Sequence, residues 1–128
     1  IAAVASISGT MLNCTGPTSH PMPVVHLHGT SDAVVSYNGS NDWNSVQSTL
    51  DYWTSFNNTI STPTINTDNT GGMTIEHYSF EQGDNSVSVE HYKYIGGDHV
   101  WFNEPYQGQN ASELVWNFMS KYDINGLR

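Results

Sequence analysis

Positive charge is nearly absent from this sequence. Lys93, Lys121 and Arg128 are the only fixed cations, against 12 acidic residues, and the formal net charge is −9. Nucleic acids and anionic membranes are bound by clustered Lys and Arg side chains, so we expect neither as a partner. No apolar run approaches the roughly 20 residues that cross a bilayer, which predicts a soluble chain.

Cysteine is almost absent as well. Cys14 is the only one in 128 residues, so the chain can form no internal disulfide. Its thiol is either buried or has a partner outside this sequence. Asn, Ser and Thr are abundant while charged residues make up 12%, a composition typical of secreted proteins. We therefore expect a secreted protein, folded as a single domain over residues 1–128.

The chain also lacks Gly-x-Ser-x-Gly, the turn that presents a catalytic serine. Two other segments are typical of a Ser-His-Asp hydrolase. The apolar run 23–28 ends in Gly29-Thr30-Ser31-Asp32, and a later run ends in Gly96-Gly97-Asp98-His99. An acid followed by a base, each after a strand, matches the order Ser, Asp, His of α/β-hydrolases. We predict that Asp32 orients His99 and that His99 is the base.

The nucleophile is then expected upstream of Ile1. The first nine residues are typical of the interior of an element, so we interpret the chain as the C-terminal part of a longer enzyme. Five serines inside the chain were considered as nucleophiles, and none of them lies on the required turn: Ser6, Ser8, Ser31, Ser36 and Ser40.

Hydrophobic periodicity predicts an α/β layer design. The predicted elements are strands over 1–8 and 23–28 with a loop over 11–22 between them, a long turn over 29–41, a helix over 42–56, a polar connector over 61–72, a β-hairpin over 73–80 and 86–95, a loop over 96–108, a helix over 111–122 and a trailing end over 123–128. Such a sheet has an unpaired edge beside residues 1–8 or 23–28. We expect this edge to pair with the missing N-terminal half or with a second copy.

The two helices have recognisable faces and ends. In the first, Trp43, Val46, Leu50, Trp53 and Phe56 form an apolar stripe. Asn41 or Asp42 is the expected N-cap, and Asn57 and Asn58 are expected to end the helix. In the second, the apolar stripe is formed by Leu114, Val115, Phe118, Met119 and Tyr122, with Asn110 or Ser112 as cap.

Two other functions compete with the esterase hypothesis. His26 and His28 face one side of a strand, as metal-ligating His-x-His pairs do, and His77 and His91 on the hairpin could join them in a small metal-binding β-barrel of the cupin type. The four tryptophans suggest a polysaccharide-binding module instead. Three of them fit helix faces and are expected in the core, namely Trp43, Trp53 and Trp116. The fourth, Trp101, is expected to line a pocket beside His99.

The sequence resembles a known family in several segments. Val25-His26-Leu27-His28-Gly29-Thr30-Ser31-Asp32-Ala33-Val34-Val35, with Tyr37-Asn38-Gly39, is similar to the acid segment of the secreted polyhydroxybutyrate depolymerase and feruloyl esterase group of α/β-hydrolases. Gly96-Gly97-Asp98-His99-Val100-Trp101 resembles its Gly-Gly-Gly-His-x-Trp base segment. Residues 2–11, Trp53 with Asn57, and Trp116-Asn117-Phe118 resemble further segments of the group.

This resemblance implies a partial α/β-hydrolase fold and a serine esterase. The chain would contribute catalytic Asp32 and His99, with Trp101 and Tyr37 contacting the ester substrate and with no cofactor or metal. Three departures are visible: Asp98 replaces a glycine, Phe102 a proline, and Thr59 the cysteine of a family disulfide. Polyester, feruloyl and acetyl esters all remain open as substrates.

Overall fold

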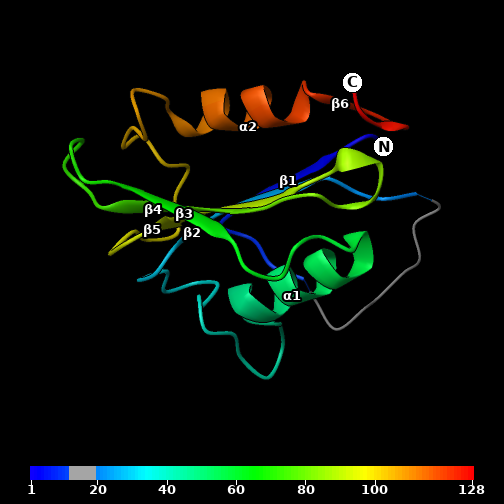
Figure 1. The fold of residues 1–128 in the computed structure, drawn as a ribbon. Helices are drawn as coiled ribbons and strands as arrows, with labels where there is room; N and C mark the ends of the chain where they lie inside the picture. Colours follow the sequence, from blue (N-terminus) through cyan, green and yellow to red (C-terminus); the bar gives the residue numbers. More distant parts are fainter. Residues whose placement is uncertain (12–19) are drawn as a thin grey trace.

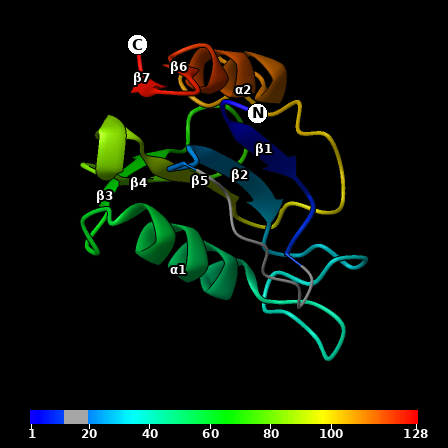
Figure 2. The ribbon, with the colours of Figure 1, turned by 90° about the vertical axis from the view of Figure 1, so that its right-hand side faces the viewer.

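A computed structural model describes residues 1–11 and 20–128. It shows a small mixed α/β domain with one five-stranded sheet and a helix on each face (Figures 1 and 2). Most of the predicted loop over residues 11–22, including Cys14, lies outside the described residues. Neither helix of the described part is long and apolar enough to cross a membrane.

The sheet has the strand order β1-β2-β5-β4-β3. Its strands are β1 (Val4–Ile7), β2 (Val24–Gly29), β3 (Thr64–Asp68), β4 (Ile75–Phe80) and β5 (Val89–Tyr94). β1, β2 and β5 run parallel, whereas β4 and β3 add antiparallel strands on the β5 side. The predicted strands and the predicted hairpin are therefore confirmed, the hairpin enclosing a short 3-10 turn, η1 (Asp84–Ser86).

One strand was not predicted. Residues 64–68 lie in the segment interpreted as a polar connector, yet they form β3, which pairs with β4 along its length. Four of the five residues are exposed, and the segment has no apolar alternation because it lies at the sheet's edge. Pairing with β4, a tertiary contact, makes this segment a strand.

Helix α1 (Val46–Asn57) begins later than predicted. Ser45 is its N-cap, accepting a hydrogen bond from the N–H of Ser48 at 3.0 Å, so the predicted caps Asn41 and Asp42 are wrong. Trp43 precedes the helix and is not part of its apolar stripe. The predicted end is confirmed, since Asn58 adopts the left-handed conformation at φ 56° that Asn tolerates.

Helix α2 (Ala111–Met119) has the predicted cap Asn110, which forms a capping box with Glu113. It ends three residues before the predicted limit. Tyr122 instead begins β6 (Tyr122–Asp123), which pairs with β7 (Gly126–Leu127). The expectation that residues 123–128 trail off is therefore wrong.

Each helix buries one face of the sheet. α2 packs Leu114 and Phe118 on Val25 and Leu27 of β2, and α1 packs Val46 and Leu50 on the opposite face. Trp116 does not contribute to the core as expected, because it is 69% exposed on the outer side of α2.

Asn57, at the end of α1, anchors the entry to β2. It is fully buried, and its side-chain amide accepts from the N–H of Met22 and donates to the C=O of Met22, both at 2.7 Å. This pair of bonds satisfies backbone groups that would otherwise be buried without a partner.

Candidate active site

The two candidate catalytic segments meet because β2 and β5 are parallel neighbours. The carboxyl ends of parallel strands lie at one edge of a sheet, where α/β proteins place their ligand sites. Asp32 follows β2 and His99 follows β5. Backbone bonds tie the two turns together, from Ser31 N–H to Gly97 C=O at 2.9 Å and from Thr30 N–H to Tyr94 C=O at 3.0 Å.

Two glycines allow this approach. A Cβ atom on Gly29 would lie 2.2 Å from the carbonyl oxygen of Gly97, a distance that no side chain tolerates. Gly97 is also enclosed, though less tightly, since its own Cβ would lie 3.0 Å from the Phe102 ring and from Cβ of Tyr94. Gly29 and Gly97 therefore have a steric cause in the packing of the two turns, whereas Gly96 adopts a positive φ of 79° that favours glycine.

Asp32 is held in one orientation. Its Oδ1 accepts hydrogen bonds from the N–H groups of Val34 at 2.9 Å and Val35 at 2.8 Å, and its Oδ2 lies 3.0 Å from Nδ1 of His99. Burial opposes ionisation of the carboxyl, but the bonds from Val35, His99 and Val34 outweigh it and lower the Asp32 pKa. Asp32 is therefore an oriented, ionised acceptor at neutral pH.

His99 has the tautomer that a general base requires. Because the Asp32 carboxylate can only accept, Nδ1 of His99 carries the proton and Nε2 carries the free lone pair. The His99 side chain is 38% exposed. Within residues 1–11 and 20–128, no serine or threonine hydroxyl is hydrogen-bonded to His99, so the described part of the chain supplies no partner for Nε2.

Asp98 shapes the His99 turn. Its Oδ1 accepts from the backbone N–H of His99 at 2.7 Å and, more weakly, from that of Ala33 at 3.4 Å. The carboxylate thus bridges the acid and base turns. Phe102 is buried and stacks on Tyr94 with ring centroids 3.9 Å apart.

The two predicted substrate-binding residues lie in different surroundings. Trp101 is 59% exposed, and its indole N–H donates to Ser112 of α2 at 3.2 Å. With exposed Val34 and Val100, it leaves apolar surface beside Asp32 and His99. The Tyr37 hydroxyl is instead bonded to His91 at 2.8 Å, and its ring lines a separate hollow under the sheet.

His28 is a residue that motif reasoning missed. It is fully buried, with Nε2 2.7 Å from the carbonyl oxygen of Val35 and 3.4 Å from Oδ2 of Asp32. It therefore holds the turn whose amides hold Asp32. The only signal in the sequence was the spacing of four between His28 and Asp32.

His28 belongs to a buried histidine column on the α1 face of the sheet. Its ring stacks on that of His26 at 5.3 Å, and His91 of β5 lies 5.4 Å from His26. Burial lowers the pKa of His26 to about 4 and that of His91 well below its usual range. His26 and His91 are therefore uncharged at neutral pH.

The expected convergence of His77 with His91 is wrong. His77 pairs across the hairpin with Tyr92, whereas Tyr78 pairs with His91, so the two histidines face opposite sides of the sheet. His77 instead lies 2.7 Å from Oε1 of Glu90. His77 is the neighbour of Tyr78, the residue that lies opposite His91. Because neighbouring residues of a strand face opposite sides of the sheet, this difference of one position separates the two histidines.

One ring nitrogen of His26 and of His28 is committed to a structural bond, whereas Nδ1 of each is buried without a hydrogen-bond partner among the described residues. Each Nε2 donates to a backbone carbonyl, that of Gly9 for His26 and that of Val35 for His28. In the described ranges 1–11 and 20–128, no three His, Cys, Asp or Glu side chains are grouped so as to hold a metal ion.

Comparison with known proteins identifies no family: no protein-family model matches the chain, and the search of curated proteins gives no match either.

Proposed function

We propose that this chain supplies the acid and the base of a secreted serine carboxylic-ester hydrolase. The observation that carries the proposal is the 3.0 Å contact between Oδ2 of buried Asp32 and Nδ1 of His99, with the other carboxylate oxygen fixed by two amides. The resemblance to the polyhydroxybutyrate depolymerase and feruloyl esterase group supports the same reaction. No cofactor is required for it.

The proposed reaction follows from this geometry. Nε2 of His99 takes the proton of a serine hydroxyl as the serine attacks the ester carbonyl carbon. The bond from Nδ1–H to Asp32 stabilises the resulting imidazolium. His99 then gives the proton to the departing alcohol, and water repeats the two steps to release the acid. Trp101, Val34 and Val100 offer an apolar surface for the ester, whereas Tyr37 lines a separate hollow and has no role in these steps.

The serine and the oxyanion donors are proposed to come from outside the described residues. The sheet has the parallel arrangement β1-β2-β5, with the candidate pair at the carboxyl ends, which is compatible with part of an α/β-hydrolase sheet. In the described part, β1 pairs on one side only. We propose that a segment N-terminal to this chain pairs there and brings the serine to His99, whereas a second copy would occupy the edge without supplying a nucleophile.

A direct test uses the natural open reading frame that contains this chain. Its product is expected to hydrolyse p-nitrophenyl acetate and to lose that activity with a serine-directed phosphonate. Asp32→Asn is expected to lower kcat by about 10⁴-fold, as loss of the orienting carboxylate does in a known triad, and His99→Ala by at least as much. Asp42→Asn, an exposed aspartate before α1, is the matched control and is expected to leave kcat unchanged.

The chain of 128 residues alone is expected to lack phosphonate-sensitive activity, because most of the rate enhancement of a triad disappears with its nucleophile. Full activity of the Asp32→Asn or His99→Ala product would contradict the proposal, as would phosphonate-sensitive turnover by the isolated chain.

A further inference from the structure

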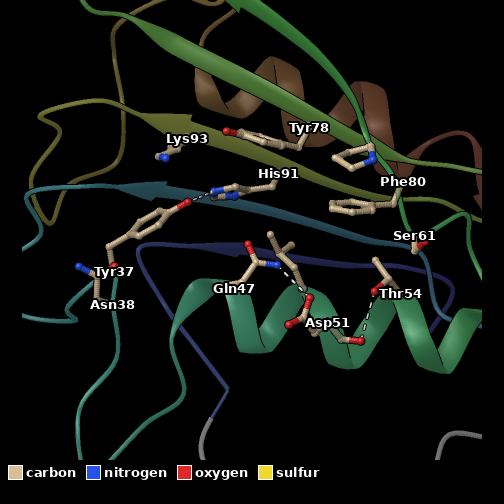
Figure 3. A pocket seen from close by; sticks show the side chains of 12 residues that line it. Tyr37, Asn38, Gln47, Asp51, Thr54, Ser61, Tyr78, Phe80, His91 and Lys93 are labelled. Atoms are coloured by element: carbon tan, nitrogen blue, oxygen red, sulfur yellow. Dashed lines mark hydrogen bonds between the residues drawn. The ribbon is translucent and has the colours of Figure 1, made fainter.

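A hollow of about 430 Å³ lies between α1 and the β4–β5 part of the sheet. Figure 3 shows that Tyr78, Phe80 and Lys93 reach it from the sheet, Gln47 and Asp51 from α1, and Tyr37 from the turn before the helix. Neither Asp32 nor His99 lines it. Its volume is within the roughly 300–1,000 Å³ of small-molecule sites.

The hollow exists because α1 presents a polar flank to the sheet. Gln47 and Asp51 are four residues apart and lie on one side of the helix, next to the buried stripe that contains Val46 and Leu50. Gln47 donates to Oδ1 of Asp51 at 2.9 Å. The two side chains therefore present an amide and a carboxylate to a ligand at neighbouring positions.

The opposite wall combines aromatic rings with one cation. Lys93 lies over the Tyr37 ring at 5.5 Å and 3.9 Å from Oε1 of Glu76. Tyr78 donates to the same Glu76 oxygen at 2.9 Å. The Tyr37 hydroxyl is oriented by its bond to His91. Burial raises the pKa of Tyr37, so this hydroxyl remains neutral.

These groups select a class of ligand. An anion would meet the Asp51 carboxylate and a chain of net charge −9, and a cation would meet Lys93. An apolar ligand would displace water from the Gln47–Asp51 pair and from Lys93, and it could not replace the hydrogen bonds that this water makes with them. A neutral polyol supplies hydroxyls that both donate and accept, and the C–H face of a sugar ring packs on aromatic side chains.

We propose that this hollow binds a neutral sugar unit of an oligosaccharide. The sugar ring lies against Tyr78 and Phe80, its hydroxyls donate to the Asp51 carboxylate and the Gln47 carbonyl oxygen, and Lys93 donates to a sugar oxygen. The site is separate from Asp32 and His99 and does not depend on the proposed esterase function.

The test is a titration of the ¹⁵N-labelled chain with xylotriose and, separately, cellotriose, followed by amide chemical shifts. Saturable shifts are expected for residues 47–54 and 78–93 with at least one of the two sugars. Gln47→Ala and Asp51→Ala are each expected to weaken binding about fivefold, the effect of losing one hydrogen bond of about 1 kcal/mol. Ser55→Ala, on the exposed side of the same helix, is the matched control and should bind as the unmodified chain does.

Each alternative result is decisive. The absence of saturable shifts with both sugars would overturn the proposal, as would shifts confined to the turns around Asp32 and His99, or equal weakening by Ser55→Ala. Glucuronic acid should bind more weakly than xylose, and tighter binding of the acid would overturn the assignment to a neutral ligand. Asp32→Asn is expected to bind the sugar normally, so failure of the esterase hypothesis is distinguishable from failure here.

Discussion

At the scale of single residues, the candidate site depends on how hydrogen-bond donors surround Asp32. Two amides hold one oxygen and His99 approaches the other. His28 acts behind them, since its Nε2 donates to the carbonyl of Val35 and thereby fixes one of those amides. His28 is thus a positioning residue, and its contribution can be separated from that of the triad.

His28→Leu is expected to destabilise the fold by about 1–3 kcal/mol, because it removes the donor of the half-buried Val35 carbonyl. It should also loosen the contact between Asp32 and His99. Chemical denaturation measures the first effect, and hydrogen exchange of the His99 Nδ1–H, followed by ¹⁵N NMR, measures the second.

His28→Gln is the matched variant because it retains an N–H donor. We expect slower exchange of the His99 proton in this variant than in His28→Leu. If the two variants exchange that proton as slowly as the unmodified chain, His28 does not position Asp32.

At the scale of elements, β2 and β5 bury two histidines, His26 and His91, whose pKa values are lowered. The pKa of His26 is lowered by burial to about 4 in the folded chain, whereas an unfolded chain has a histidine pKa of about 6.5. Between these values the unfolded state binds a proton that the folded state does not bind. Stability therefore decreases as the pH falls from about 6.5 to about 4.

The expected loss from His26 over this range is on the order of 3 kcal/mol, and His91 acts in the same direction because its pKa is also lowered. Urea denaturation at several pH values measures it. His26→Gln should be less stable at pH 7 but should show a shallower decrease towards pH 4. An equal slope in both proteins would contradict the assignment of the pH dependence to His26.

At the scale of the whole molecule, the two edges of the sheet differ. β3 is a polar, exposed edge strand. β1 is half-buried and contains Val4, Ala5 and Ile7. In the described part of the chain it is paired with β2 alone. The backbone N–H groups of Val4 and Ser8 donate to the residue before β2 and to β2 itself. Because successive N–H groups of a strand point to opposite sides, the N–H of Ala5 points away from β2.

We therefore expect the chain to self-associate through β1, since an exposed edge strand pairs with other strands. Sedimentation should show a concentration-dependent species larger than a monomer. Ala5→Pro removes the outward donor and keeps those that bond to β2, so it should give a monomer with an unchanged far-ultraviolet spectrum. A strictly monomeric unmodified chain at all concentrations would contradict this prediction.

Local pattern alone determined much of this protein. The period-2 runs predicted the β4–β5 hairpin, Asn110 and Asn58 marked helix ends, and the glycine-rich motifs identified Asp32 and His99. These signals are local because strand alternation, capping and turns involve residues close in sequence. The same reasoning placed the start of α1 at the wrong cap, because several capping residues precede the helix and only packing decides among them. It also placed Trp116 in the core, because only packing decides which side of α2 faces the sheet.

Only the tertiary structure decided how distant segments pack. The sequence predicts that Asp32 meets His99, but it does not pair Gly29 with Gly97, place His91 beside His26 rather than His77, or convert residues 64–68 into a strand. Each of these depends on strand order and register, because a neighbouring strand supplies the missing contact or bond. The hollow of Gln47, Asp51 and Lys93 has the same origin, since it lies where a helix and two strands remote in sequence leave a polar gap.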